Sequence, residues 1–200
     1  MLEEMPILPK ESACVWTIGH SRHSIIEFQN LLRQYQIEVV VDVRTTPHSR
    51  LNPQFNSDFI KNELALNSIK YLYMGKELGG RPDDDSLYDS NGHVLYGELA
   101  KTSHFQSGIE RILEGAQKFR VAVMCSEGKP DGCHRHLLIG RVLAEKNCDV
   151  LNILPDGGII EYLELQPEES QFTLLGEEVK PWKSLLSVRQ GFQQKNSLRF

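Results

Sequence analysis

Short apolar runs and amphipathic stretches alternate along most of this chain. Five runs have the length and β-branched content of strands: residues 14–18, 37–43, 69–73, 121–124 and 149–154. Apolar residues recur at helical spacing in four further stretches: residues 24–35, 57–66, 103–118 and 136–143. Strands that alternate with helices are typical of parallel crossover units. The pattern therefore predicts an α/β domain with a mainly parallel, doubly wound three-layer sheet of about five strands, with helices on both faces.

Several segments carry more specific local signals. Ser24, followed by Glu27 three residues later, has the spacing of a capping box and predicts a helix that begins there. Residues 37–43 (IEVVVDV) are apolar on both faces, as a central parallel strand should be, whereas residues 69–73 (IKYLY) alternate and predict a less buried strand. Residues 74–92 are polar and rich in glycine, and loops of this length inside a compact domain are usually functional or mobile.

Length and composition favour one domain with extensions. The chain has 200 residues, of which 40% are hydrophobic, and this is enough to bury a core. We expect a leader over residues 1–12, an α/β domain over residues 13–162 and a C-terminal extension over residues 163–200. Trp182 and Phe192 are the residues expected to hold that extension against the domain.

Charge and cysteine content limit the function classes. The chain has 22 Lys and Arg against 27 Asp and Glu, and the net charge of −5 argues against a protein that coats nucleic acid non-specifically. It has no run of 18 apolar residues, and its start lacks the basic and apolar regions of a signal peptide, so we expect a cytoplasmic protein with no membrane partner. Its four widely spaced cysteines are expected to be reduced thiols.

Polar segments follow four of the expected strands, at the point where each strand ends. These segments are Gly19-His20-Ser21, residues 44–50, residues 73–81 and residues 125–135. In an open parallel sheet the ligand site lies beyond the carboxyl ends of the strands. We therefore expect these segments to meet at one edge of the sheet and to form a single site.

The strongest candidate for chemistry is the segment VAVMCSEGKPDGCHRHLLIGR, residues 121–141. It is typical of a buried strand, a turn-rich loop and a helix, with Cys125 at the strand exit and Cys133 at the helix start. A helix N-terminus supplies unpaired N–H groups and a positive dipole end, which favour a thiolate or a bound anion. Cys125 is thus either a nucleophile or a small buried residue that ends a strand. Cys133 is either a resolving thiol or a packing residue.

Charged residues around these cysteines complete the candidate site. Glu127 acts as a general acid or base if burial raises its pKa, or else pairs with Arg135. Arg44 is expected to hold an anionic group through its planar fork while Asp42 positions a neighbouring loop, and a structural ion pair is the alternative. His20 is either a cap for the adjacent loop or the base that activates the site.

Glycines and polar residues at the same edge add expected ligand contacts. Gly79 and Gly80 allow a close backbone approach or a turn with positive φ. The full set to which we assign ligand binding is Asp42, Arg44, Ser49, Tyr73, Gly79, Gly80, Cys133, His134 and Arg135.

Four separated motifs resemble the domain of unknown function 488 family. They are TIGHS (17–21), VDVR (41–44) with Pro47 and Ser49, YMGKELGG (73–80) and CSEG…CHRH (125–136). The resemblance covers about residues 15–162 and implies a fold and a set of motif positions, but no reaction.

The order of Asp42-Val43-Arg44, the Cys125 loop and DVLNILPDGG is also similar to that of rhodanese-like domains. In those domains a loop cysteine carries a persulfide or binds an anion. Here seven residues separate Cys125 from Cys133, and Arg135 follows ten residues after Cys125, whereas cysteine-phosphatase loops have an arginine after six. Sulfur or phosphate transfer is therefore implied by analogy alone.

Two other function classes compete with this interpretation. A metal-stabilised regulatory domain would bind zinc, although the spacing does not match known zinc sites; its ligands would come from Cys125, Cys133, His134, His136 and His20. A nucleic-acid or nucleotide binding module would use arginines with aromatic stacking surfaces, here Arg44, Arg50, Arg81 and Arg135 with Tyr71, Tyr73 and Phe55.

Our leading hypothesis is an enzyme-like α/β domain, a thiol-dependent transferase or hydrolase without a cofactor or a metal. Its catalytic residues are Cys125, Glu127 and His20. Its pocket of Cys, Glu, Arg and His side chains takes a small anionic or phosphorylated ligand, such as a nucleotide. The sequence indicates no oligomeric state.

Overall fold

The computed structural model of this protein describes residues 13–165 and 182–186. The expected leader and the proposed anchor Phe192 lie outside the described residues, as does most of the expected C-terminal extension. None of the helices in the described part has the length and apolar character that a membrane-spanning helix requires.

A single sheet of six strands organises the described residues, in the order β3-β2-β4-β1-β5-β6. The strands are β1 (Cys14–Gly19), β2 (Val39–Asp42), β3 (Lys70–Tyr73), β4 (Val121–Cys125), β5 (Asp149–Ile153) and β6 (Ile159–Glu161). All neighbours are parallel except β5 and β6, which are antiparallel. The α/β class and the mainly parallel sheet are thus confirmed, with one strand more than the sequence predicted. The rhodanese-like order stays a prediction.

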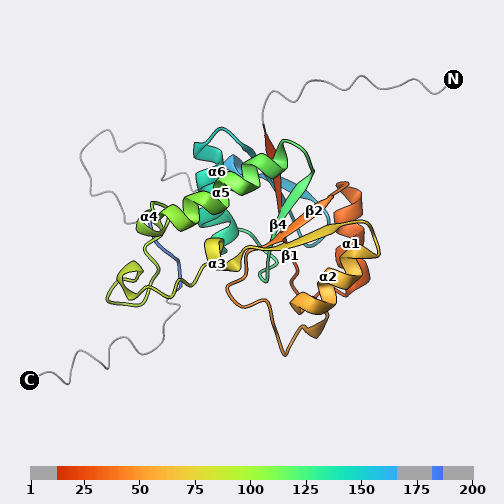
Figure 1. Cartoon of the computed structure of the whole chain (residues 1–200), viewed down its shortest axis with the longest axis horizontal. Coiled ribbons are helices and arrows are strands. Elements are labelled where there is room, and N and C mark those ends of the chain that lie inside the picture. Colours follow the sequence, from red (N-terminus) through yellow and green to blue (C-terminus); the bar gives the residue numbers. More distant parts are fainter. Residues whose placement is uncertain (1–12, 166–181, 187–200) are drawn as a thin grey trace, which may run out of the picture.

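Helices cover both faces of the sheet (Figure 1). The α-helices are α1 (Ile25–Gln34), α2 (Ser57–Ala65), α3 (Gly75–Leu78), α4 (Tyr96–Leu99), α5 (Ser103–Ala116) and α6 (Arg141–Glu145). The other helical segments are the 3-10 turns η1 (Pro53–Phe55), η2 (Asp85–Leu87) and η4 (Leu163–Leu165) and the π-helix η3 (Arg135–Gly140). On one face α1 and α2 pack against the sheet, and on the other face α5 and α6 do so.

The alternation of side chains along the strands divides the core into two clusters. Val39, Val41 and Val121 face α5, whereas Val40 and Ala122 face α1 and α2. Every residue of β2 and β4 is buried, and both strands lie in the interior of the sheet, with strands on either side. β3 is less buried than β2 and β4, as its sequence predicted, and it lies at one edge of the sheet.

The helix boundaries follow the sequence signals closely. Ser24 caps α1 with the complete reciprocal capping box to Glu27.

Residues 136–143, expected as one regular helix, instead form the π-helix η3 followed by the short α6. A π-turn inside a helix is rare and occurs often at functional sites, because it shifts side chains out of the regular helical register. Here it lies directly after Cys133 and His134.

The long polar segment after β3 is only partly irregular. It contains α3 and η2, and Tyr88 pairs with Val94 in an antiparallel bridge. Residues 182–186 lie beside this segment, where the backbone N–H of Ser184 donates to the carbonyl of Val94 at 2.9 Å.

Candidate functional site

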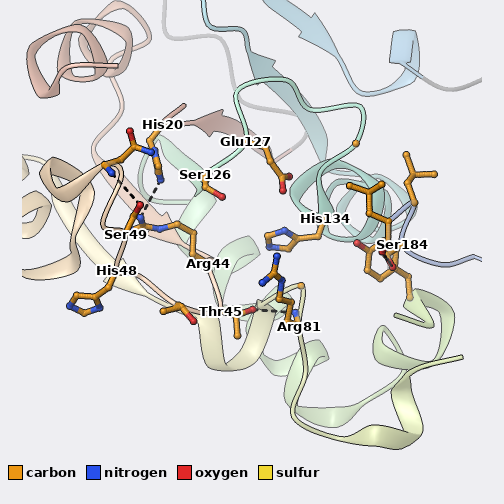
Figure 2. Close-up of a pocket in the computed structure, with 17 residues that line it drawn as sticks. His20, Arg44, Thr45, His48, Ser49, Arg81, Ser126, Glu127, His134 and Ser184 are labelled. Carbon is orange, nitrogen blue, oxygen red and sulfur yellow. Dashed lines mark hydrogen bonds between the residues drawn. The ribbon is translucent and has the colours of Figure 1, made fainter. Parts of the chain in front are cut away.

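The polar segments at the carboxyl ends of β1, β2 and β4 meet, as expected, around a cavity of about 420 Å³. The loop after β2 lines it with Arg44, Thr45, Thr46, His48, Ser49 and Asn52. The loop after β4 contributes Ser126, Glu127, Gly132 and His134, and His20, Gly80 and Arg81 come from the other two segments. Figure 2 shows Arg44, Ser49 and His20 on one side of this cavity and Ser184 on the opposite side, with Glu127 and His134 between them.

Directly behind this wall lies a buried pair of cysteines with an arginine. The sulfurs of Cys125 and Cys133 are 2.8 Å apart, and Nη1 of Arg135 donates to Cys125 Sγ at 2.8 Å. Each of the three side chains is at most 1% exposed. The cysteines therefore lie next to the cavity, but neither forms part of its lining in this conformation.

Arg135 is the largest fully buried side chain among the described residues. Its guanidinium donates to acceptors on β1, on β4 and in the loop after β4. Nε donates to Thr17 Oγ1 on β1 at 3.2 Å, and Nη2 donates to the carbonyl of Gly128 at 2.9 Å. Nη1 also donates to the carbonyl of Glu127. The guanidinium thus holds the β4 loop over Cys125. The expected contact between Arg135 and Glu127 exists, but it is made by the Glu127 backbone and not by its carboxylate.

Gly19, at the end of β1, makes this close packing feasible. A Cβ at this position would overlap the carbonyl of Glu127 and would lie 2.9 Å from Nη1 of Arg135. Only a residue without a side chain lets the β4 loop cross the end of β1 at this distance. The glycine of the TIGHS motif therefore has a steric role in the site.

The two buried thiols have pKa shifts in opposite directions, and Arg135 donates to the Cys125 sulfur. Burial raises the pKa of the Cys125 thiol, but the hydrogen bond from Cys133 and the charge of Arg135 outweigh burial, so its pKa lies below the ordinary value. Burial, together with the hydrogen bond to Cys125 and the charge on it, raises the pKa of Cys133 well above the ordinary value. Cys125 is thus the more acidic thiol of the pair.

His134 faces the second cysteine. Its Nδ1 lies 3.8 Å from Cys133 Sγ, and its Nε2 lies 3.1 Å from the carbonyl of Val43. Since a carbonyl only accepts, Nε2 carries the proton and Nδ1 presents its lone pair to the thiol. Burial lowers the pKa of His134, which keeps the ring neutral. Gly80 leaves room for this ring, because a Cβ there would lie 2.7 Å from His134 Cγ.

A second buried network lies at the end of β2. Asp42 accepts from Arg44 Nε at 2.9 Å, from Arg44 Nη2 at 2.6 Å and from the Tyr71 hydroxyl at 2.6 Å. Nη2 of Arg44 also donates to the carbonyl of Phe55 at 2.8 Å. Asp42 is fully buried and Arg44 is 6% exposed, so this is the structural ion pair that the sequence left open. Arg44 nevertheless lines the cavity, whereas Asp42 does not.

His20 belongs to this second network. Its Nδ1 is 2.9 Å from the carbonyl of Ser21, its Nε2 is 3.2 Å from Nη1 of Arg44, and its ring stacks on Phe55. Burial, with the nearby charge of Arg44, lowers the pKa of His20 to about 4. Since Nδ1 donates to a carbonyl and Nε2 accepts from a guanidinium, neither nitrogen is available as a base. The contacts of His20 are those of a residue that positions Arg44.

Glu127 is the exposed member of a group that has the donor types of a metal site. A carboxylate oxygen of Glu127 and the sulfurs of Cys125 and Cys133 all lie within 4.8 Å of one another. Thiolate and carboxylate groups are ligands that zinc accepts. The structure therefore brings together two of the proposed zinc ligands, Cys125 and Cys133, with Glu127 as a third. His136, also proposed as a ligand, packs its ring against Tyr162.

The other residues predicted to bind ligand divide into two groups. Ser49 and Gly80 line the cavity. Tyr73 and Gly79 support its wall from behind, because the Tyr73 hydroxyl donates to the carbonyl of Thr45 at 2.9 Å and a Cβ on Gly79 would lie 2.7 Å from Thr45 Oγ1. Gly79 and Gly80 both pack closely against neighbouring groups, and neither glycine has a positive φ.

Sequence reasoning missed two features of the site. The first is the segment 182–186, in which Ser184, Leu185 and Leu186 line the cavity opposite Arg44. Trp182 anchors it by donating from Nε1 to the carbonyl of Leu137 at 2.8 Å. The sequence predicted that Trp182 holds the extension against the domain, and this contact confirms it, but the sequence did not indicate that the residues after Trp182 line the cavity.

The second missed feature is the support of Arg135 by buried polar residues. Thr17 donates from Oγ1 to Asn152 Oδ1 at 2.9 Å, and both residues are fully buried in neighbouring strands. A signal existed here, because Asn152 is a single amide in the apolar run DVLNIL. A polar residue inside a buried strand needs a partner in the core.

Two residues proposed for nucleic-acid contact do not reach the surface. Phe55 is fully buried between His20 and Phe28, and Arg135 is fully buried at the cysteines. Stacking of a base on Phe55 and a phosphate contact by Arg135 were therefore wrong expectations. Phe55 packs in the core instead, and Arg135 donates to the Cys125 sulfur.

Comparison with known proteins gives one match. A family model described as "Domain of unknown function DUF488" matches residues 24–142. These residues extend from the N-cap of α1 to the start of α6, and they include both cysteines and most of the cavity wall. No curated protein and no solved structure matches this chain.

Proposed function

This chain belongs to the DUF488 family, whose description names no reaction, and on that premise we propose a function from its own site. We propose that the protein is an enzyme-like domain that binds a small anionic or phosphorylated ligand and acts on it through the Cys125 thiolate. The observation that carries this proposal is the contact of 2.8 Å between Arg135 Nη1 and Cys125 Sγ, directly behind the wall of the cavity.

The chemistry of the cavity wall supports an anionic ligand. Arg44 uses one Nη1 hydrogen for His20, and the other remains for a group in the cavity. Arg81 and His48 lie on the same wall, and Ser49 adds a hydroxyl. Guanidinium forks match the geometry of phosphate and carboxylate oxygens. The ion pair with Asp42 fixes Arg44 before any ligand binds, which lowers the ordering cost of binding.

The reaction class that we propose is transfer of a group to sulfur. The electron pair of the Cys125 thiolate forms a bond to an electrophilic atom of the ligand, while the bond from that atom to its leaving group breaks. Water or a second acceptor then releases the group. Because Cys125 lies behind the wall, the Ser126–Gly132 loop has to shift before the ligand reaches the sulfur. The rhodanese-like order of strand, cysteine loop and helix supports this class by analogy.

The long loop resolves one difficulty raised by the sequence. Cysteine-dependent anion loops place an arginine close after the cysteine, and here the arginine follows ten residues later. The loop folds back over β1, so that Arg135 still reaches Cys125. Contact between thiolate and guanidinium therefore does not need the shorter spacing.

Thiol labelling of the full chain at graded pH tests this proposal. With iodoacetamide as the probe and peptide mass spectrometry as the readout, we expect Cys125 to react well below about pH 8, the range of an ordinary thiol. We expect inorganic phosphate to slow the labelling, and we expect Arg81→Gln to weaken that protection. The matched control is Arg22→Gln, an exposed arginine outside the cavity wall. A Cys125 that stays unreactive below about pH 8 ends the nucleophile proposal, and labelling that phosphate does not affect ends the ligand proposal.

The second candidate is a metal-stabilised regulatory domain, which the group formed by Cys125, Glu127 and Cys133 favours. Two thiolates on one tetrahedral zinc, with Zn–S distances of about 2.3 Å, are roughly 3.8 Å apart. The sulfurs would therefore have to separate from their present 2.8 Å. Elemental analysis of the purified protein tests this candidate, which predicts one zinc ion per chain.

A further inference from the structure

Cys125 and Cys133 are placed for a bond between their sulfurs. The sulfurs lie 2.8 Å apart, so a disulfide bond of about 2.0 Å requires a movement of less than about 1 Å. The seven residues between the two cysteines form an irregular loop that can absorb this movement. We propose that the pair is a two-cysteine site at which a small hydroperoxide oxidises Cys125 and Cys133 then closes an intramolecular disulfide.

The first step uses the contact with Arg135. The electron pair of the Cys125 thiolate forms an S–O bond with one peroxide oxygen, and the O–O bond breaks. The second oxygen leaves as hydroxide or alkoxide and takes a proton from the medium. Cys125 is now a sulfenic acid, oxidised by two electrons, and the peroxide has been reduced. Arg135 favours this step because it holds the sulfur as a thiolate and can donate to the departing oxygen.

The second step uses Cys133 and His134. The Cys133 sulfur attacks the Cys125 sulfur, the S–S bond forms, and the S–O bond breaks. The hydroxyl leaves as water with the proton that Cys133 gives up. Nδ1 of His134 lies 3.8 Å from Cys133 Sγ with its lone pair toward the thiol, so it accepts that proton and passes it on. His134 is a positioning and proton-transfer residue in this step only.

Access to the sulfurs favours a small oxidant. Neither cysteine lines the cavity, and a segment that includes Ser126 and Glu127 separates them from it. Gly132, at the far end of the loop, is exposed, and a Cβ there would meet no atom within 4 Å. A molecule with the size of hydrogen peroxide needs a smaller opening there than a peptide or glutathione disulfide. The oxidant class is therefore a small hydroperoxide.

This inference rests on the Cys125 thiolate of the proposed function, but it does not need the anionic ligand. The two can therefore fail separately. If disulfide formation is observed and phosphate gives no protection from labelling, the ligand proposal fails and this inference stands. If phosphate protects and no disulfide forms, this inference alone fails.

The experiment treats the reduced, full-length protein with one equivalent of hydrogen peroxide, blocks remaining thiols with iodoacetamide and maps the peptides by mass spectrometry. We expect one disulfide between Cys125 and Cys133, and alkylated Cys14 and Cys148. In Cys133→Ser we expect oxidation to stop at a Cys125 sulfenic acid that dimedone traps. In Cys125→Ser we expect the oxidation of Cys133 to be slower by about tenfold or more, because the remaining thiol keeps its proton.

Two further variants separate chemistry from folding. His134→Gln is expected to slow disulfide closure by about tenfold or more while dimedone trapping of Cys125 stays at the wild-type rate. Cys148→Ser, at a buried cysteine away from the cavity wall, is expected to form the disulfide at the wild-type rate. The inference is overturned if wild-type Cys125 and Cys133 both remain open to alkylation after peroxide, or if one zinc ion per chain occupies them. It is also overturned if the disulfide links another pair.

Discussion

Nη1 of Arg135 lies 2.8 Å from Sγ of Cys125, and both side chains are almost completely shielded from solvent. A buried guanidinium without an acceptor is costly, and so is a buried thiolate without a donor. Each group therefore stabilises the charged form of the other. The carbonyls of Glu127 and Gly128 take further donors of the same guanidinium, so the contact also fixes the loop above the sulfur.

Removal of this guanidinium is expected to affect stability and reactivity together. Arg135→Met leaves Cys125 and the loop carbonyls without their donor, and we expect a loss of about 3–5 kcal/mol in the free energy of unfolding. We also expect the pH at which Cys125 reacts with iodoacetamide to rise. Urea unfolding and labelling rates measure the two effects. The control is Arg111→Met, which removes an exposed ion pair with Glu77 and should cost less than about 1 kcal/mol. Equal losses in the two variants would contradict the assignment.

The glycine at the end of β1 gives a prediction with an internal control. Gly19→Ala would place a Cβ on the carbonyl of Glu127, so the β4 loop has to move, and we expect a loss of about 1–3 kcal/mol in unfolding free energy. Gly132→Ala, in the same loop, meets no atom within 4 Å and should change stability by less than about 0.5 kcal/mol. Thermal or urea unfolding compares the two. A Gly19 variant as stable as the Gly132 variant would show that the loop does not cross β1 so closely.

The sequence predicted the sheet, the main helices and the edge at which the site lies, because each depends on a local pattern. Apolar runs on both faces marked β2 and β4, and the Ser24–Glu27 spacing marked the start of α1. The position of a polar segment after a strand was enough to place it at the carboxyl edge. All of these signals lie within a few neighbouring residues.

The features that the sequence did not predict depend on partners that are distant along the chain. Arg135 is held by Thr17 across 118 positions, and His93 contacts the carbonyl of Ser184 across 91 positions. Hydrophobic periodicity indicates that a residue is buried, but it does not identify the group that the residue contacts. Similarly, the π-helix at η3 has no local pattern that separates it from an α-helix.

The buried pair at the end of β2 should be one of the strongest determinants of stability. Asp42→Asn removes the counter-charge of a guanidinium that is 6% exposed, and we expect a loss of about 3–5 kcal/mol in unfolding free energy. Tyr71→Phe removes one hydrogen bond to the same carboxylate and leaves the ion pair, so we expect a smaller loss of about 1.5–3 kcal/mol in unfolding free energy. Asp58→Asn, on the exposed face of α2, serves as control and should change little. Urea unfolding measures the loss of unfolding free energy in the three variants. A loss in the Asp42 variant no larger than that in the Tyr71 variant would contradict a buried charge pair.

His20 predicts how stability depends on pH. Its pKa is lowered from 6.5 to about 4 in the folded protein, so between these values the unfolded chain binds a proton that the folded chain does not. The free energy of unfolding should therefore fall as pH falls from about 6.5 to about 4, by at most about 3 kcal/mol from this residue, and stay level with respect to it below that. His20→Gln keeps an acceptor for Arg44 and cannot be protonated, so its curve should fall less steeply. His104→Gln, on the exposed side of α5, should keep the wild-type slope. Urea unfolding at several pH values measures the three curves, and equal slopes for wild type and His20→Gln would mean that His20 is not held neutral beside Arg44.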